Sequence, residues 1–411
     1  MTQKILEGVV VLDLTRFFSG PQSTLFLAGL GAEVVKIDDP QTGDPTAFAP
    51  PFAGPSGVSF TRQTDSDMGI AYMKRARGKK SVSLNLKSGA GREIFLRMVK
   101  NADVVVDNFS TGVADRLGIG YSALKQANPK IIYCSLTGYG STGPDKSLKA
   151  YDLMVQAAVG LMSITGHREM PPTKAGSPLS DAIAGVFAAM GMVSALLHRE
   201  RTGEGQSIDV SMADCLFSLI FDEPLDCYRR LGLDFQQGSR IMRFSPFNAY
   251  PSADGWITIG AATQDDWLAL LDVMGKGDLR QNEPLMTISW RLANNAEVDA
   301  IVSEWTVGRT NQNIMALLAE AKVPCSPVRS IDEVLNWEQM KERKMASALW
   351  NPLSNSQMDA AAPSFPVKFG ASPSGYDSPA PLPGQHSDEV LSRLANLSAD
   401  DLSSLREAGV V

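Results

Sequence analysis

Short apolar runs alternate with helical segments in the first half of the chain, and this alternation restricts the available folds more than any other feature. Residues 9–12 read Val-Val-Val-Leu and residues 34–37 read Val-Val-Lys-Ile, which is typical of strands buried on both faces. Between them, Gly20 and Pro21 break the chain and precede a helical segment over 22–30. Further strand candidates lie at 81–86, 104–106, 131–135 and 207–210. Strands that alternate with helices predict an α/β domain with a mostly parallel sheet.

The tryptophans mark a second region of the chain. All six lie between Trp256 and Trp350, although the chain has 411 residues. Connections that contain Pro and Gly flank this region, so residues 245–330 are predicted to form a second, smaller domain. Beyond it, residues 361–384 are rich in Pro, Ser and Ala and are expected to run extended over a surface. An amphipathic segment at 387–395 is expected to close the chain.

The charge and the hydropathy pattern argue against several classes of protein. The 38 basic and 45 acidic side chains give a formal net charge of −7, whereas a general nucleic-acid binder needs a basic surface. No stretch approaches about 18 uninterrupted apolar residues, and the N-terminus lacks the apolar core of a signal peptide. We therefore expect a cytoplasmic protein without a membrane span. An anionic ligand would have to be met by a local cluster of positive charge.

Familiar cofactor and metal motifs are missing from the sequence. The four cysteines form no CxxC pair and the three histidines are scattered, so no metal site is predicted and free thiols are expected. The turn after the first strand, residues 13–20, is bulky rather than glycine-rich, so it lacks the dinucleotide-binding fingerprint. There is also no P-loop and no GxSxG nucleophile motif.

Asp181 lies in the most informative segment. It stands at the start of a long helix of small and apolar residues that runs to about residue 197 and is ended by Gly203. Two interpretations are open. Asp181 is either an ordinary N-cap or a nucleophile, since a helix N-terminus stabilises an ionised carboxylate. Gly185 and Gly191 on the same helix would allow a neighbouring backbone to pack closely.

A series of motifs runs over nearly the whole chain in a fixed order. The motifs are 6–13 with 19–21, 31–37, 102–109, Tyr151 with Asp152, the Asp181 segment, 201–206, 254–255 and 384–386. In this order they resemble the class III CoA-transferases of the CaiB/BaiF type, which include formyl-CoA:oxalate and carnitine CoA-transferases. No single motif is decisive, but the ordered series is highly specific.

The resemblance implies that Asp181 is the catalytic residue. Its carboxylate would attack an acyl-CoA thioester and give an aspartyl mixed anhydride with free CoA thiolate. The thiolate would return to form an aspartyl-CoA thioester, which the acceptor carboxylate then attacks. Acyl activation is kept through each step, as a thioester or an anhydride, so the expected partners are acyl-CoA and a small carboxylic acid, with no metal and no tightly bound cofactor.

The resemblance also implies where CoA binds. The densest basic run, residues 74–80, could be a solvated turn by composition alone, but the family places CoA-binding residues near it. The implied CoA-binding residues are Arg75, Lys79, Lys80, Asn108, Phe109, Arg116 and Lys149, and the implied substrate-pocket residues are Phe18, Ser19, Tyr151 and Gly176. Asn108 could instead cap a turn, and Lys149 could simply be exposed.

Three departures from the formyl-CoA transferase branch indicate a different acyl substrate. Phe18-Ser19 replaces Gln-Ala before Gly-Pro, Asp39 replaces an arginine, and no glycine-rich loop lies between 238 and 265.

Two other functions remain open as alternatives. The same family fold hosts α-methylacyl-CoA racemases, which need an acid and a base on opposite faces of the α-carbon. Racemases have histidine where this chain has Tyr151, and tyrosine, with a pKa of about 10, is a poor base at neutral pH. The second alternative is a non-catalytic acyl-CoA-binding protein, which the complete motif around Asp181 disfavours.

The expected architecture combines the chain order with the resemblance. Family members form intertwined homodimers, so an interlocked homodimer is expected here. The predicted parts are a discontinuous, Rossmann-like large α/β domain over 1–215 and 340–411, a small α+β domain over 240–330, and linkers at 216–239 and 331–339.

Overall fold

The computed structural model describes residues 3–411, and the chain divides into two compact units. The large unit comprises the chain up to Val159, Gly176–Glu223 and Glu338–Val411. The small unit comprises Gly160–Ala175 and Pro224–Trp337. It therefore includes residues 160–175, which no sequence signal had placed with the tryptophan-rich region.

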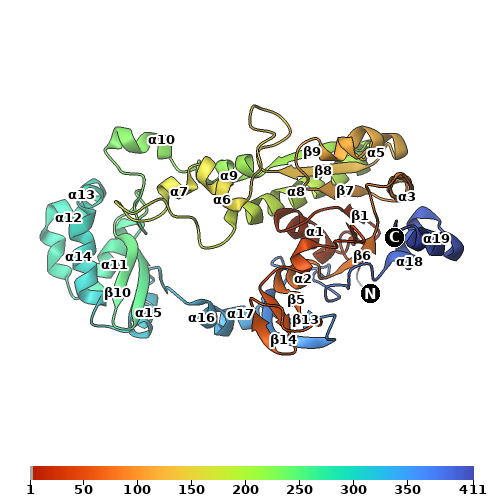
Figure 1. Cartoon of the computed structure of the whole chain (residues 1–411). Helices are drawn as coiled ribbons and strands as arrows, with labels where there is room; N and C mark the ends of the chain where they lie inside the picture. Colours follow the sequence, from red (N-terminus) through yellow and green to blue (C-terminus); the bar gives the residue numbers. More distant parts are fainter. Residues whose placement is uncertain (1–2) are drawn as a thin grey trace. The chain divides into compact units, whose positions relative to one another are not determined.

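A six-stranded sheet forms the centre of the large unit (Figure 1). The strand order is β6-β2-β1-β7-β8-β9, and every neighbouring pair is parallel. The strands are β1 (Val10–Asp13), β2 (Glu33–Asp38), β6 (Lys79–Ser83), β7 (Val104–Asp107), β8 (Ile132–Thr137) and β9 (Ser207–Ser211). All six predicted strands are present with ends shifted by a few residues, and the predicted α/β class with a parallel sheet is confirmed.

The strand order reverses beside β1. From β1 the sheet continues through β2 to β6 on one side and through β7 to β9 on the other. In open α/β sheets, ligands bind outside the carboxyl ends of the strands at such a reversal. The segments that leave these ends are residues 14–18 after β1 and residues 108–112 after β7.

Helices connect the strands and cover the sheet. The principal ones are α1 (Ser19–Gly29), α3 (Gly89–Val99), α5 (Tyr121–Ala127), α8 (Leu179–Thr202) and α9 (Met212–Ile220). The large unit also contains η1 (Pro45–Ala47), β3 (Phe52–Gly54), β4 (Gly57–Ser59), β5 (Met68–Gly69), α2 (Ile70–Arg75), α4 (Val113–Arg116), α6 (Asp152–Ala158), α17 (Glu338–Glu342), β13 (Ala346–Asn351), β14 (Ser356–Pro363), α18 (Ser387–Ala395) and α19 (Ala399–Glu407).

The C-terminal helices belong to the same core as the first strands. Leu12 of β1, Val35 of β2 and Phe95 of α3 are buried together with Leu391 of α18 and Leu402 of α19. Burial of these side chains ties the end of the chain to the N-terminal sheet. The amphipathic helix predicted at 387–395 is present, but the expectation that it closes the chain was wrong, because α19 follows it.

Helix α8 has the length and composition of a membrane-spanning helix, and 44% of its most apolar window is buried inside the protein. One face packs against α1, and Asp181 lies in its first turn. Gly203 ends the helix in the left-handed conformation with φ of 78°, as predicted for its C-terminal cap.

The small unit combines a three-stranded antiparallel sheet with helices. Its core contains Trp267 and Trp305 from the tryptophan-rich region. Its elements are α7 (Leu161–Ile164), α10 (Leu225–Tyr228), η2 (Arg229–Leu231), β10 (Phe247–Ser252), β11 (Gly255–Gly260), α11 (Gln264–Val273), η3 (Gly277–Gln281), α12 (Glu283–Met286), α13 (Ile288–Ala293), α14 (Asn295–Thr306), α15 (Asn311–Glu320), β12 (Cys325–Pro327) and α16 (Ile331–Asn336).

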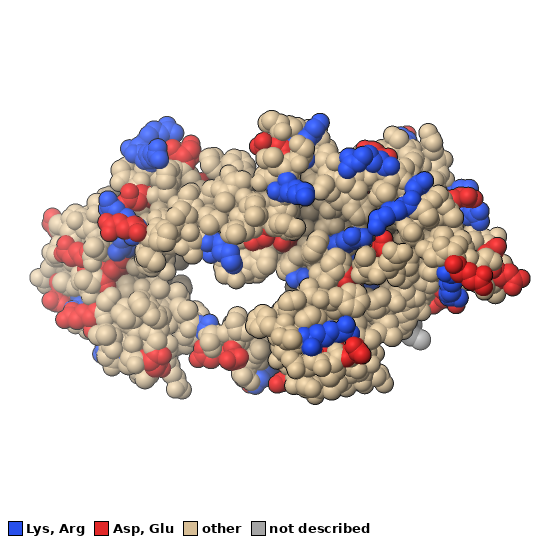
Figure 2. Space-filling model, viewed as in Figure 1, with Lys and Arg blue, Asp and Glu red and all other residues tan. Residues whose placement is uncertain are grey.

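Residues 364–386 connect β14 to α18 without forming a helix or a strand, in line with the prediction for the Pro-rich segment. They are held against the large unit, since Gly375 donates a backbone hydrogen bond to Gly29 and Ser378 accepts one from Gly78. On the face shown in Figure 2, basic and acidic side chains of the described residues are interspersed over the surface.

Candidate active site

A cavity of about 330 Å³ lies in the large unit at the carboxyl ends of β1 and β7. Asp181 forms part of its wall. The other lining residues come from the loops after β1, β7 and β8, from the end of β8 and from the starts of α1 and α9. They are Phe17, Phe18, Ser19, Asn108, Phe109, Ser110, Thr111, Leu136, Thr137, Gly138, Lys146, Leu148, Lys149, Ala150, Tyr151 and Met212. The cavity therefore lies at the reversal of the strand order, where ligands of such sheets bind.

The first turns of α1 and α8 meet at Asp181. A Cβ atom on Gly185 would lie 3.0 Å from the carbonyl oxygen of Ser19, so the glycine allows the two helices to approach closely, as predicted. Ser19 is the first residue of α1, and its hydroxyl and N–H both form hydrogen bonds that stabilise the charged carboxylate of Asp181. The positive ends of two helices thus lie beside one carboxylate.

Asp152, the first residue of α6, holds the first turn of α8 in place. Its Oδ1 atom accepts hydrogen bonds from the N–H of Ser180 at 2.8 Å, from the hydroxyl of Ser180 at 2.7 Å and from the N–H of Asp181 at 3.4 Å. Its Oδ2 atom accepts one from the amide of Gln156 at 2.7 Å. These bonds satisfy N–H groups that a helix start leaves unpaired, so Asp152 is a positioning residue for Asp181.

The surroundings of Asp181 change its acidity. The pKa of Asp181 is raised to about 6, chiefly because burial disfavours the charged form. The negative charge of Asp152 also raises this pKa, whereas the hydrogen bonds from Ser19 and the positive charge of Arg75 lower it. At neutral pH most molecules therefore carry an ionised carboxylate that is poorly hydrated. A carboxylate that is charged, oriented and partly shielded from water is suited to act as a nucleophile.

The loop after β1 is strained at the edge of the cavity. Phe17 has φ of 69°, a left-handed conformation that is unfavourable for a bulky residue. Asn108 holds Arg16, the residue before Phe17, through two hydrogen bonds. Its Oδ1 accepts from the N–H of Arg16 at 2.9 Å, and its Nδ2 donates to the carbonyl of Arg16 at 2.8 Å. Both polar side-chain atoms of Asn108 therefore bind the loop after β1, and the residue also lines the cavity.

Arg75, at the end of α2, also contacts this loop. Its Nη1 donates to the carbonyl of Phe17 at 3.0 Å, and its guanidinium lies 3.8 Å from the centroid of the Phe18 ring. Its positive charge also acts on Asp181. Arg75 thus contributes to the nucleophile's surroundings as well as to the shape of the loop.

Comparison with known proteins identifies the family. Residues 6–387 match the model of CoA-transferase family III. The chain belongs to CoA-transferase family III. It is 30% identical to succinate–glutarate CoA-transferase of Agrobacterium fabrum, over 95% of this chain and 96% of that protein. It is 34% identical to succinyl-CoA:mesaconate CoA-transferase of Haloarcula marismortui, over 94% and 95% of the two chains.

Solved structures agree with this assignment. A CaiB/BaiF family protein from Brucella suis has a TM-score of 0.80 and 30% sequence identity, with 95% of this chain and 100% of that chain covered. The chain is therefore an enzyme that transfers CoA and uses CoA thioesters as substrates. Among residues 3–411, the structure shows no group of three or more His, Cys, Asp or Glu side chains that could hold a metal ion.

Most of the sequence-predicted site residues of the transferase meet at the cavity. Those that line it are Phe18, Ser19, Asn108, Phe109, Lys149, Tyr151 and Asp181. Sequence reasoning missed Lys146, which lines the cavity from the same loop as Lys149. The sequence signal that could have identified Lys146 is its position in a polar segment, three residues before Lys149 and close to the Tyr151-Asp152 motif.

The other predicted residues lie outside the cavity wall. Lys79 is buried, with its ammonium 3.0 Å from Asp13 and 2.7 Å from the hydroxyl of Thr24, so it faces the interior and not a ligand. Lys80 forms ion pairs with Glu33 and Glu389. Arg75 contacts the loop as described, Arg116 is exposed at the end of α4, and Gly176 is exposed before α8.

We expect Asp152→Ala to lower kcat by about 100-fold, because loss of the hydrogen bonds to the first turn of α8 displaces the nucleophile. The same change is expected to lower the free energy of unfolding by about 1–2 kcal/mol, as for the loss of a helix cap. Asp152→Asn is the matched control, since its amide oxygen can still accept from Ser180. Equal losses of kcat in both variants would show that the charge of Asp152, and not its positioning role, is what matters.

Proposed function

We propose that Asp181 is the covalent nucleophile that moves CoA from an acyl-CoA donor to a carboxylic acid acceptor. The observation that carries this proposal is the placement of the Asp181 carboxylate. It lies in a cavity wall, oriented by Asp152 and stabilised in its charged form by Ser19 at the start of α1. Family membership supports the overall reaction, and the proposed intermediates follow from the chemistry of a carboxylate at this position.

The proposed reaction has four balanced steps. The carboxylate of Asp181 attacks the thioester carbonyl, the C–S bond breaks, and an aspartyl mixed anhydride and CoA thiolate result. The thiolate attacks the aspartyl carbonyl of the anhydride and releases the donor as a free carboxylate. The acceptor carboxylate attacks the resulting aspartyl-CoA thioester and frees the thiolate again. The thiolate finally attacks the acyl carbonyl of the new anhydride, which gives the product acyl-CoA and regenerates Asp181.

Each attack develops negative charge on a carbonyl oxygen. The N-terminus of α1 directs its positive end and the N–H of Ser19 toward Asp181, so it is the proposed stabiliser of this charge. Water must be kept from the anhydride while it exists, and Phe17, Phe18 and Tyr151 supply apolar surface around the cavity.

The proposed CoA site runs along the cavity away from Asp181. Lys146 and Lys149 supply positive charge for the phosphates, and Phe109 supplies an aromatic surface for the adenine. Arg116 lies near the same end, beside Gly112 of the segment after β7. Lys79 and Lys80 are left out of this site because of their partners within the protein.

The proposed acceptor is a dicarboxylic acid. The relatives described above are named for succinate, glutarate and mesaconate, which all carry two carboxylates. Arg75 is the cation that acts on Asp181 from the end of α2, so it is the proposed partner of a second carboxylate that lies beside the reacting one.

The transferase is proposed to form a homodimer in the cytoplasm. The outer faces of α8 and α9 expose large apolar side chains, among them Val186, Met190, Phe217 and Leu219. Exposed apolar surface of this kind marks protein–protein contact. All four cysteines are free thiols, which fits a reducing compartment.

Trapping of the activated aspartyl group tests the proposed mechanism. Incubation with succinyl-CoA and hydroxylamine is expected to convert Asp181 into a hydroxamate, located by mass spectrometry of the peptide that contains it. The modification should require the acyl-CoA and should be absent when free succinate and CoA are added instead. Exchange of the α-hydrogen of an acyl-CoA for deuterium, without modification of Asp181, would instead support the racemase alternative.

A further inference from the structure

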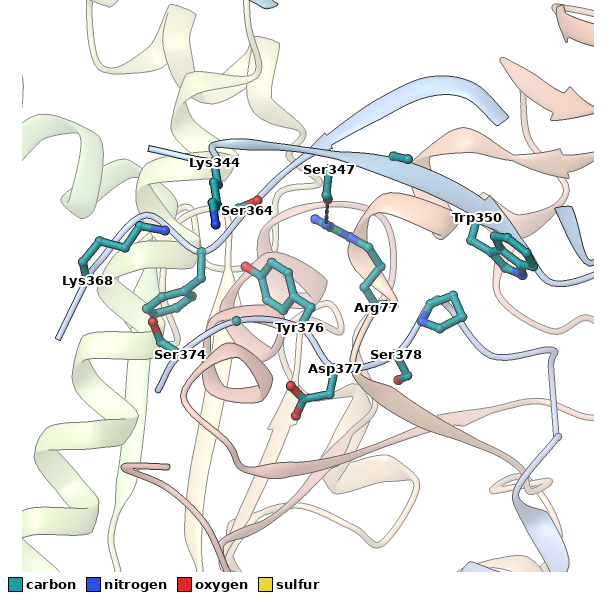
Figure 3. A pocket seen from close by; sticks show the side chains of 14 residues that line it. Arg77, Lys344, Ser347, Trp350, Ser364, Lys368, Ser374, Tyr376, Asp377 and Ser378 are labelled. Carbon is teal, nitrogen blue, oxygen red and sulfur yellow. Dashed lines mark hydrogen bonds between the residues drawn. The ribbon is translucent and has the colours of Figure 1, made fainter. Parts of the chain in front are cut away.

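A second cavity, of about 630 Å³, lies in the large unit and shares no lining residue with the Asp181 cavity. It forms where the segment from α17 to α18 folds over the turn between α2 and β6. Figure 3 shows Lys344 and Lys368 at one end, Trp350 at the other, and Tyr376 and Arg77 between them. Its volume is in the range of cavities that hold small organic ligands.

Positive charge gathers along this cavity. Arg77, Lys344 and Lys368 line it, and Asp377 is the single carboxylate among the described residues that do so. Asp377 is already neutralised by an ion pair with Lys4 at 2.5 Å. The cavity thus carries an excess of positive charge in a protein whose net charge is −7, which favours an anionic ligand.

Arg77 is a buried residue of the cavity wall, held by hydrogen bonds within the protein. It is only 6% exposed, and its guanidinium donates to the hydroxyl of Ser347 at 3.2 Å and to the carbonyl of Pro363 at 2.8 Å. The same guanidinium lies over the ring of Tyr376, 4.6 Å from its centroid. Arg77 therefore fixes the floor of the cavity, while Lys344 and Lys368 remain on its exposed side.

The two ends of the cavity differ in chemistry. The lysine end also presents the hydroxyl of Ser364 (Figure 3), which can donate to a phosphate oxygen. The hydroxyl of Ser374 at the same end donates to the carbonyl of Val367 at 3.0 Å. At the other end Trp350 is 39% exposed, so part of its indole is available for stacking. A ligand that matches both ends carries phosphates at one end and a flat aromatic ring at the other.

We propose that this cavity is a nucleotide-binding site, with the phosphates at Lys344 and Lys368 and the base against Trp350. The site is separate from the proposed CoA site at Asp181. A nucleoside diphosphate has the required combination of charge and aromatic surface, and two lysines can meet its two phosphates as charge-assisted hydrogen bonds.

Calorimetric titration with ADP tests the proposal. Wild type is expected to bind ADP, and Lys344→Ala combined with Lys368→Ala should weaken the affinity by about 100-fold, as expected for the loss of two charge-assisted contacts. Inorganic pyrophosphate should compete with ADP, whereas adenosine should bind far more weakly. Binding should also quench the fluorescence of Trp350, and Trp350→Phe should remove this quenching.

The control variant combines Lys87→Ala with Lys125→Ala, which removes two lysines that line neither cavity. It should bind ADP as wild type does, and all variants should keep their thermal stability. Absence of ADP binding to wild type, or unchanged affinity in the Lys344 and Lys368 variant, would overturn the proposal. So would loss of ADP binding in a Lys146→Ala and Lys149→Ala variant instead, because ADP would then occupy the Asp181 cavity.

Discussion

Asp181→Asn is expected to lower the rate of CoA transfer by about four orders of magnitude or more, as for the loss of other covalent nucleophiles. Asparagine has nearly the same shape and can stay beside Ser19, but its amide cannot form an anhydride or a thioester. The assay follows conversion of succinyl-CoA and a dicarboxylic acid into the new acyl-CoA by mass spectrometry. The matched control is Asp65→Asn, which changes an exposed aspartate outside the cavity and should leave the rate unchanged.

The stability of Asp181→Asn separates lost chemistry from lost structure. Because burial raises the pKa of Asp181 to about 6, the folded protein holds this proton more tightly than the unfolded chain does. The wild type therefore loses stability as the pH rises from about 4 to about 6 and stays at this lower stability at higher pH, and the amide avoids this cost. We expect the variant to be at least as stable as wild type at pH 8, with a smaller advantage at pH 5. A full transfer rate in the variant would contradict the assignment of Asp181 as nucleophile.

The parallel sheet could be predicted because its signal is local. Strands such as β1 and β7 are buried on both faces, so each one requires a nearly continuous apolar run that is visible in the sequence. The inclusion of residues 160–175 in the small unit could not be predicted in this way. It depends on contacts with residues far along the chain, and no local pattern records them.

The site shows the same division between local and distant signals. Asp181 could be recognised from its place at a helix start and from the family motif around it. The positioning role of Asp152 could not, because it rests on hydrogen bonds to residues 28 and 29 positions later. The hydrogen bond between Asn108 and Arg16 joins residues 92 positions apart, so it also could not be predicted from neighbouring residues.

Lys79 and Lys80 show how a basic run can mislead. The family resemblance implies that both bind CoA, but they lie in β6, where successive side chains point to opposite faces. Lys79 points inward to Asp13, which lies 66 positions earlier, and Lys80 points outward to Glu389. Because side chains alternate along the strand, one of these adjacent lysines forms a buried ion pair and the other forms ion pairs at the surface.

Lys79→Met is therefore expected to lower the free energy of unfolding by about 3–5 kcal/mol, because it leaves the charge of Asp13 buried without its ammonium partner. Lys80→Met, the matched control, removes partly exposed ion pairs with Glu33 and Glu389 and should cost no more than about 1 kcal/mol. The measurement is urea unfolding of the whole protein, followed by circular dichroism.

A double variant and the KM for acyl-CoA together decide whether Lys79 forms a buried ion pair or binds a phosphate of CoA. Asp13→Asn combined with Lys79→Met removes both charges, so it should recover part of the stability that Lys79→Met alone loses. If Lys79 instead held a phosphate of CoA, Lys79→Met would raise the KM for acyl-CoA by about tenfold and leave the urea midpoint unchanged. A buried ion pair predicts the reverse, a large shift of the midpoint with the KM of the remaining folded enzyme close to that of wild type.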